Sequence, residues 1–134
     1  MADDRRQVER ETVLDVPPDE VWEAVTDERL LGEWLADEVE LEPEPGGNAR
    51  FRFEDGSERS GTVLRVEEER RLSFTWALPG EPETEVEITL EPLVAGTRLM
   101  VVERASVHTP VALSGAAWGT RLSALAGATS FALV

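Results

Sequence analysis

Apolar and polar residues alternate along most of the chain, which predicts a protein built mainly of strands. In residues 7–16 the even positions Val8, Arg10, Thr12, Leu14 and Val16 share one face, and Pro17-Pro18 then ends the strand. Further alternating segments occupy residues 37–43, 48–53, 60–66, 71–76, 85–92 and 97–104, joined by Pro, Gly and Asp-Gly turns. About six consecutive strands with such short links predict an antiparallel meander.

Two short helices are expected between the first two strands, where the apolar spacing changes from two to about 3.6. Pro18 suits a first helical position, and Asp19 and Glu20 follow it where the helix dipole favours acidic residues. The apolar stripe of this helix is Val21, Trp22 and Val25. Thr26 or Asp27 can cap a second short helix, which carries Leu30, Leu31 and Trp34.

A third helix is predicted at the C-terminal end, starting near Pro110 and running to about Ala126. Its apolar stripe consists of Val111, Trp118, Leu122 and Leu125. Three glycines within this helix lower its intrinsic stability, so it should require packing against the rest of the protein. The final segment, Ser130-Phe131-Ala132-Leu133-Val134, is apolar, and we expect it to pack on the domain or to contact another chain.

Composition excludes several classes of function. The 134 residues are enough for one domain, 1–134, and the absence of Cys removes disulfides and thiolate chemistry. A net charge of −15 makes nucleic acid a poor partner, and the acidic residues are interpreted as a solvated face. No apolar run is long enough to span a membrane, and the charged N-terminus argues against a signal peptide, so we expect a cytoplasmic protein.

The order of the predicted elements and several short motifs resemble a known superfamily. The motifs are Pro18-x-Glu20-Val21-Trp22 with Thr26-Asp27, the Leu31-to-Trp34 spacing, Gly46-Gly47, Gly61-x-Val63, residues 71–76, Leu90-Glu91-Pro92, residues 96–99 and Trp118. The chain resembles the START-related, or SRPBCC, superfamily, and within it the bacterial branch named after the activator of a heat-shock ATPase. The resemblance implies an α+β helix-grip fold: a curved antiparallel sheet of about six or seven strands around one long C-terminal helix.

That resemblance also implies a cavity between the sheet and the terminal helix for an apolar or aromatic ligand. The residues expected to face inward are Leu14, Trp34, Phe51, Phe53, Leu64, Leu72, Phe74, Trp76, Val86, Ile88, Leu99, Val101, Trp118, Leu122 and Leu125. The alternative for any one of them is an ordinary close-packed core without a ligand. Trp22 is expected to anchor the first short helix, whereas Trp34, placed at the rim, is the better candidate for a ligand contact.

Two charged residues share the inward face of the predicted sheet. The resemblance makes the first and last strands neighbours, so Arg10 and Glu103 can face each other. They form either a buried pair that orients a polar ligand group or an exposed ion pair near the open end of the cavity, and the exposed pair is favoured.

The sequence offers little support for catalysis. His108 is the only histidine, which excludes a histidine-cluster metal site, and we expect it in a solvent-exposed loop. No cofactor motif is present, and the absence of Tyr removes an acid that cyclase-type members can use. The sequence therefore favours non-catalytic binding of a small hydrophobic or aromatic ligand. One alternative is a protein-interaction module, co-chaperone-like or homodimeric, with Leu30-Leu31 and the final segment, residues 130–134, as the segments to inspect. The other is an enzyme of cyclase or hydrolase type, for which Arg10, Glu103 and His108 are the only candidates.

Overall fold

A computed structural model describes residues 7–105, 113 and 115–132, with side chains to residue 127. The elements in chain order are β1 (Gln7–Leu14), α1 (Pro18–Thr26), α2 (Glu28–Leu31), β2 (Glu38–Leu41), β3 (Asn48–Arg52), β4 (Glu58–Glu67), β5 (Arg71–Trp76), β6 (Thr84–Leu93), β7 (Gly96–Ala105) and α3 (Gly115–Ala132). This order is the predicted one: a strand, two short helices, six strands and a terminal helix. The α+β helix-grip fold is therefore confirmed.

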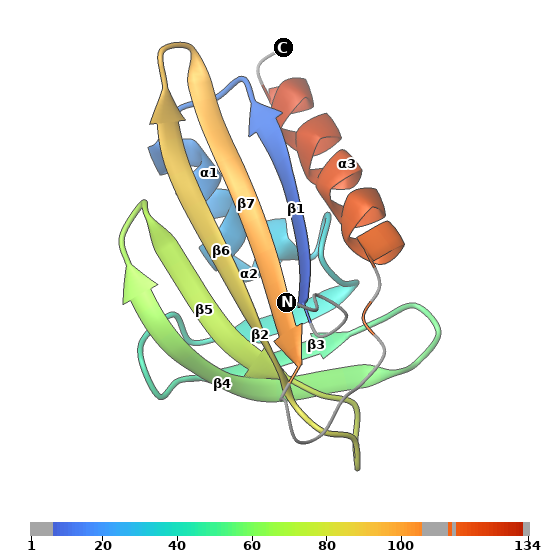
Figure 1. The fold of residues 1–134 in the computed structure, drawn as a ribbon. Coiled ribbons are helices and arrows are strands. Elements are labelled where there is room, and N and C mark those ends of the chain that lie inside the picture. The colour runs from blue at the N-terminus through green and yellow to red at the C-terminus, as the bar shows by residue number, and fades with distance from the viewer. Residues whose placement is uncertain (1–6, 106–112, 114, 133–134) are drawn as a thin grey trace, which may run out of the picture.

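All seven strands form one antiparallel sheet in the order β1-β7-β6-β5-β4-β3-β2. Each of β2 to β6 pairs with the strand that follows it, as expected for a meander, and β1 completes the order beside β7. The sheet stays open, so β1 and β2 are its two edges. It bends strongly, and Figure 1 shows β2 and β3 running across the lower part of the view at a steep angle to β1 and β7.

The two short helices form where the sequence predicted them, although the second is shorter. Asp27 caps α2, because its Oδ1 atom accepts hydrogen bonds from the backbone N–H groups of Arg29 at 2.9 Å and Leu30 at 3.1 Å. The helix ends at Leu31, so the expectation that Trp34 belongs to it is wrong: Trp34 lies in the following turn. Leu31 is buried and Leu30 is half-buried, so this pair is not an exposed apolar patch.

The terminal helix α3 packs beside β1 and extends to Ala132, six residues beyond the predicted end. Trp118, Leu122 and Leu125 are buried, as their spacing predicted. The predicted start near Pro110, the stripe position Val111 and the side chains of the final apolar segment lie outside the described residues.

The core lies between the concave face of the sheet and the helices. It contains most of the predicted inward residues of the strands. Phe53 is only half-buried, and Leu64 is 45% exposed, whereas its neighbour Val63 is 1% exposed. The pairing between β4 and β5 shifts register between Val63 and Arg65, which is an irregularity of the β-bulge type. Such an extra residue changes which side chains point inward. Strict alternation therefore fails at this position.

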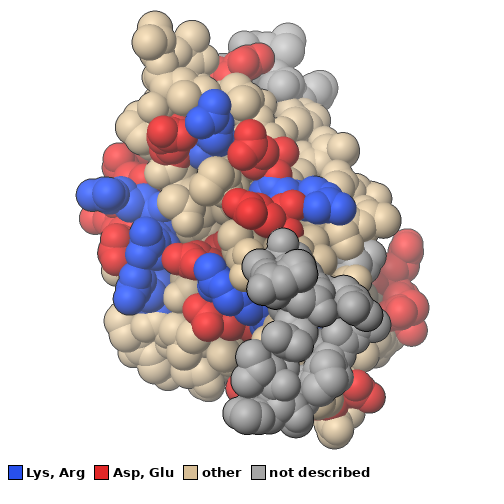
Figure 2. Space-filling model, viewed as in Figure 1, with Lys and Arg blue, Asp and Glu red and all other residues tan. Residues whose placement is uncertain are grey.

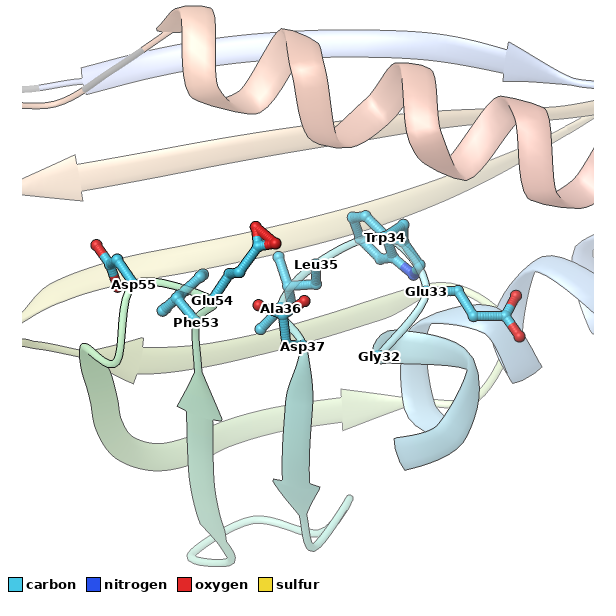
Figure 3. A pocket seen from close by; sticks show the side chains of 9 residues that line it. All are labelled: Gly32, Glu33, Trp34, Leu35, Ala36, Asp37, Phe53, Glu54 and Asp55. Carbon is cyan, nitrogen blue, oxygen red and sulfur yellow. The ribbon is translucent and has the colours of Figure 1, made fainter.

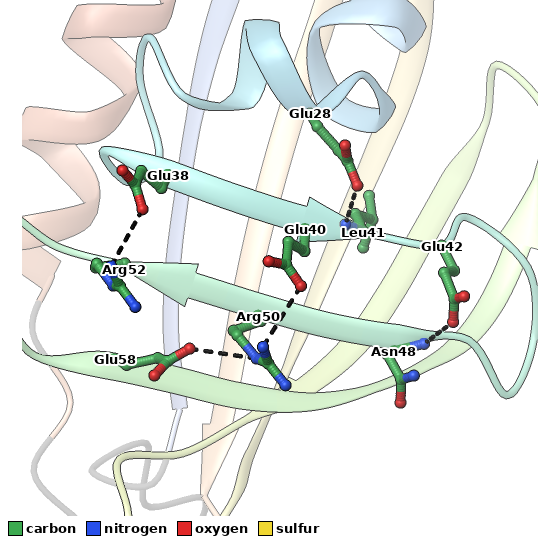
Figure 4. A network of polar contacts seen from close by, with 9 residues as sticks. All are labelled: Glu28, Glu38, Glu40, Leu41, Glu42, Asn48, Arg50, Arg52 and Glu58. Carbon is green, nitrogen blue, oxygen red and sulfur yellow. Dashed lines mark hydrogen bonds and ion pairs between the residues drawn. The ribbon is translucent and has the colours of Figure 1, made fainter.

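The outer face of the sheet carries ion pairs between arginine and glutamate. Figure 2 shows blue and red side chains intermixed over this face, with neither sign gathered into one large patch. Arg98 lies 2.8 Å from Glu91, and Arg104 lies 3.1 Å from Glu87. On the neighbouring part of the sheet Arg50 bridges Glu40 on β2 and Glu58 on β4 (Figure 4). The acidic residues thus form a solvated face in which arginines are paired.

Candidate functional site: a buried carboxylate in an aromatic cluster

Among the residues that the structure describes, one charged side chain is buried in the interior. It is Glu103 on β7, with 5% of its surface exposed. Its Oε2 atom accepts hydrogen bonds from Trp76 Nε1 at 2.9 Å and from Thr84 Oγ1 at 2.6 Å. Its Oε1 atom accepts one from Trp118 Nε1 at 2.8 Å. Three uncharged donors therefore replace the water that burial removes, which is the condition for keeping a carboxylate inside a protein.

These four residues meet because of the register of the sheet. Trp76 at the end of β5 pairs with Thr84 at the start of β6. Thr84 pairs with Ala105, and Glu103 lies two residues before Ala105 on the same face of β7. The helix α3 then brings Trp118 over this end of the sheet. The site thus joins three strands to the terminal helix.

Aromatic rings surround the carboxylate. The ring centroid of Trp76 lies 5.8 Å from that of Trp118, with the two rings stacked at 26°, and 5.7 Å from that of Phe74. Phe51 meets Trp76 edge to face at 5.2 Å. Phe53, which is half-buried, meets Trp76 at 6.2 Å. Trp76 is therefore the centre of a continuous aromatic cluster that reaches from Glu103 to the protein surface at Phe53.

Two arginines lie against the same cluster. The Arg59 Cζ atom lies 4.9 Å from the Trp76 ring centroid. The Arg121 Cζ atom lies 4.7 Å from the centroid of Trp118, 5.3 Å from that of Trp76 and 5.7 Å from that of Phe53. Burial and the nearby charge of Arg59 lower the pKa of the Arg121 guanidinium, and the negative charge of Glu103 partly offsets them.

A small pocket of about 160 Å³ opens beside the carboxylate. Arg59, Trp76, Thr84 and Glu103 line it, and Ala77, Leu78, Glu81 and Pro82 complete its walls. An engineered protein cavity of similar volume holds a benzene molecule. The pocket is thus the size of one aromatic ring, with both a cation and a carboxylate in its wall.

A larger open groove of about 450 Å³ lies at the ends of β2 and β3. It is lined by residues 32–37 and 53–55, and Figure 3 shows them on the side that faces α3. Trp34, Leu35 and Phe53 supply apolar surface, and Glu33, Asp37, Glu54 and Asp55 make the rim acidic. Because Phe53 contacts both Trp76 and Arg121, this groove and the carboxylate pocket are joined by the aromatic cluster.

A third groove, of about 870 Å³, is bordered by Pro18, residues 68–70, residues 89–92 and Met100. Met100 alternates with the inward residues Leu99 and Val101 of β7, and therefore points to the outer face of the sheet. This groove is not part of the space between the sheet and α3.

The structure distributes the predicted ligand-cavity residues over four environments. Trp34 and Phe53 line the open groove, and Trp76 and Glu103 line the small pocket. Six others are buried in the close-packed core and line neither: Phe51, Phe74, Leu99, Val101, Trp118 and Leu122. Arg10 is exposed; its Nη1 donates to the Glu9 carbonyl at 2.7 Å, and its guanidinium lies against Gly115 of α3.

The favoured interpretation of Arg10 and Glu103 as an exposed ion pair is wrong for Glu103, which is buried. The strand pairing places Val8 opposite Glu103 and Val101 opposite Arg10, and the hydrogen bonds of the carboxylate go to the two tryptophans and Thr84. Neutral donors made burial of the carboxylate possible, and these donors come from distant parts of the sequence.

Sequence reasoning missed Arg59, Thr84 and Arg121, although the two arginines had a signal. Arg59 continues the inward alternation backwards from Val63 through Gly61, before the bulge. Arg121 is three residues from Trp118 and four from Leu125, so it shares the buried side of α3. Arginine is normally a surface residue, so neither signal by itself indicates a position inside the protein.

The described residues give no support for metal chemistry or for a membrane span. No group of three or more His, Asp or Glu side chains among them is arranged to hold a metal ion. None of the described helices is long and apolar enough to cross a membrane. The remaining catalytic candidate, His108, lies outside the described residues.

The fold is a curved sheet packed around one terminal helix, and its aromatic interior reaches the surface. These features define a helix-grip domain of the ligand-binding or interaction class. The sequence profile described as Activator of Hsp90 ATPase homolog 1-like protein matches residues 15–128. The chain belongs to this family, and with it to the SRPBCC superfamily. A comparison with curated proteins finds no match.

Solved structures share this fold over nearly the whole chain. DynU16, a protein of the dynemicin biosynthetic locus, is 28% identical with a TM-score of 0.83; the match covers 95% of this chain and 48% of DynU16, so the chain spans about half of that protein. CalU16 from Micromonospora echinospora is 31% identical with a TM-score of 0.74, over 95% of this chain and 78% of CalU16. The Aha1 dimer from Colwellia psychrerythraea is 16% identical with a TM-score of 0.77, over 92% and 95%, and shows likeness of fold alone.

Proposed function

We propose that this protein binds a small hydrophobic or aromatic molecule, without catalysis, at the groove lined by residues 32–37 and 53–55, on the side of β2 and β3 that faces α3. One observation carries the proposal: aromatic surface is continuous from Phe53 in the groove through Trp76 to the small pocket beside Glu103. The groove has a volume of about 450 Å³, which lies in the range of small-molecule sites.

The geometry favours a planar ligand. Phe53 is half-buried and presents its ring between the groove and Trp76, so an aromatic molecule in the groove can stack on it or meet it edge to face. The acidic rim of the groove stays hydrated and repels anionic lipid surfaces, which supports a free small molecule over a membrane as the partner.

The interaction-module alternative has less support from the described surface. Its exposed large apolar residues are Val13 on β1, Leu64 on β4 and Val94 in the β6–β7 turn. They sit on separate elements, and single exposed apolar residues are normal for a folded protein.

The proposal is tested by adding neutral probes of increasing size to the purified protein: indole, 2-naphthol and decanol. Ligand-observed NMR gives binding, and native mass spectrometry gives stoichiometry and oligomeric state from the same samples. We expect saturable binding of 2-naphthol to the monomer. The Phe53→Ala variant should weaken it about two- to tenfold, the range of one aromatic contact.

Leu64→Ala is the matched control, because it also removes apolar surface from a partly exposed strand residue but lies outside the groove. It should leave 2-naphthol binding unchanged. Failure of all three probes to bind would contradict the proposal, and a dimer that binds none of them would favour the interaction module.

A further inference from the structure

We propose that Arg59 and Arg121 form an anion subsite, and that the ligand of this protein is an aromatic carboxylate whose ring lies against Trp76. The inference rests on the proposed function and names the chemical class of the ligand. Its starting point is the position of the two guanidinium groups, which approach the same Trp76 ring from β4 and from α3.

Arg59 and Arg121 differ in their ion pairing from the arginines on the outer face of the sheet. Arg50, Arg52, Arg71, Arg98 and Arg104 each lie within 4 Å of a glutamate. No described carboxylate lies within that distance of Arg59 or Arg121, in a protein with 28 acidic residues. The exposed residues Arg10 and Arg70 also have no ion pair among the described residues, but Arg59 and Arg121 are half-buried and lie against the same ring. Two neighbouring half-buried arginines without an ion-pair partner among the described residues are more consistent with a site for an external anion than with a structural ion pair.

The surroundings of Arg59 and Arg121 favour the binding of an anion between the two guanidinium groups. Both side chains are half-buried, so water screens their mutual repulsion less than at an exposed surface. The depressed pKa of Arg121 reports the same repulsion and desolvation. A carboxylate placed between the two guanidinium groups reduces both the repulsion between them and the cost of their desolvation. It can also accept two parallel N–H···O hydrogen bonds from a planar guanidinium group.

The charge balance selects a monoanion. Two guanidinium charges and the buried charge of Glu103 leave one net positive charge around Trp76. A dianion such as a phosphate monoester would bring more negative charge than the site can neutralise, and the carboxylate of Glu103 would repel it. Glu81 also lines the pocket, but it is exposed, and solvent screens its effect.

The shape of the pocket selects an aromatic ring beside the anion. About 160 Å³ accommodates one six-membered ring, and Trp76 forms a flat wall next to Arg59. A benzoate-like group therefore fits the volume, the ring contact and the charge together. An acetate ion satisfies the charge alone, and benzamide satisfies the ring alone.

The test compares benzoate, benzamide and acetate on the unmodified protein, with the indole N–H signals of Trp76 and Trp118 as NMR reporters. We expect benzoate to bind at least about tenfold more tightly than either of the others, since a charge-assisted hydrogen bond contributes about 1.5–3 kcal/mol. This preference opposes the net charge of −15, which repels anions, so only local positive charge explains it. Benzoate binding should weaken as NaCl is added.

Variants then assign the effect to the two arginines. Arg59→Gln and Arg121→Gln should each remove most of the preference for benzoate over benzamide. Arg50→Gln is the control, since it removes the same charge from an ion-paired arginine on the outer side of the sheet (Figure 4) and should retain the preference. Unfolding curves identify any variant that fails to fold, and the comparison of the three ligands on the unmodified protein needs no variant.

Two results overturn the subsite in different ways. If 2-naphthol binds but benzoate and benzamide bind equally, or if Arg59→Gln and Arg121→Gln behave like Arg50→Gln, the anion subsite is wrong and the proposed function stands. If neither the neutral probes nor benzoate binds, both are wrong.

Discussion

Trp118 of α3 donates its indole N–H to the buried carboxylate of Glu103 on β7, across 2.8 Å. This hydrogen bond links the terminal helix to the centre of the sheet through a charged group. The other carboxylate oxygen accepts from Trp76 and Thr84, so one side chain holds together α3, β5, β6 and β7. The stability of the contact between α3 and the sheet therefore depends on the hydrogen bonds that the carboxylate of Glu103 can accept.

Glu103→Gln should lower the free energy of unfolding by about 1–3 kcal/mol. The amide keeps the shape, but its NH₂ group faces at least one N–H donor that the carboxylate had satisfied. Urea unfolding followed by tryptophan fluorescence measures the change. Glu85→Gln is the matched control, because Glu85 lies on the outer face 3.9 Å from Arg104 and should change stability by less than about 0.5 kcal/mol. Equal effects of the two substitutions would contradict the role of Glu103.

Trp34→Phe should destabilise the protein more than Trp22→Phe, by about 2 kcal/mol against less than about 1 kcal/mol. Trp34 is buried, and its Nε1 donates at 2.9 Å to the carbonyl of Ala24 in the last turn of α1, where helical carbonyls lack an intrahelical donor. Trp22 is half-buried. This order is the reverse of the one that the sequence suggested. The denaturant midpoints of the two variants measure this difference. A larger loss of stability in Trp22→Phe than in Trp34→Phe would support the order suggested by the sequence.

Val63→Ala should cost about 2 kcal/mol, whereas Leu64→Ala should change stability by less than about 0.5 kcal/mol. The pair tests the register shift in β4, which places Val63 in the core and Leu64 at the surface. Thermal unfolding of both variants provides the measurement. If Leu64→Ala is the more damaging change, the strand is paired one residue away from the register described.

The pKa of Asp55 lies below its ordinary value, because the hydroxyl and the backbone N–H of Ser57 both donate to its Oδ1, at 2.6 and 2.8 Å. A carboxyl with a lowered folded-state pKa stabilises the fold above its unfolded pKa, and this contribution is lost as the pH falls through the folded pKa. Ser57→Ala should therefore raise the pKa of Asp55 in an NMR titration. Ser60→Ala, on the neighbouring strand, should leave it unchanged. An unaltered pKa in Ser57→Ala would exclude the hydroxyl as the main cause.

Local patterns were sufficient to predict most of the fold. The alternation of Leu99, Val101 and Glu103 gave the inward face of β7, and the stripe of Trp118, Leu122 and Leu125 gave the buried face of α3. These patterns work because each element must bury one face, which fixes the period of its apolar residues. The register shift at Val63 was not predictable, since a bulge depends on how two strands pair and not on the residues of one strand.

The candidate site was predicted only in part, because its chemistry comes from contacts between distant residues. Alternation placed Glu103 on the inward face, but the donors that allow its burial lie 15, 19 and 27 residues away in sequence. The usual cost of burying a charge therefore favoured solvent for this residue. Arg59 and Arg121 were not among the residues expected to face inward, and only the three-dimensional arrangement shows that both meet Trp76.

The two free edges of the open sheet limit how copies of this chain can associate. The edge strand β1 exposes Glu9 and Glu11, and the opposite edge strand β2 has four residues and exposes Glu38 and Glu40. Unpaired edges are templates for strand addition, and charged side chains and short strands are the usual protection against it. Two copies brought together edge to edge would place acidic residues against acidic residues. Extension of the sheet from one molecule to the next, the first step of β-type aggregation, is therefore opposed at both of its ends.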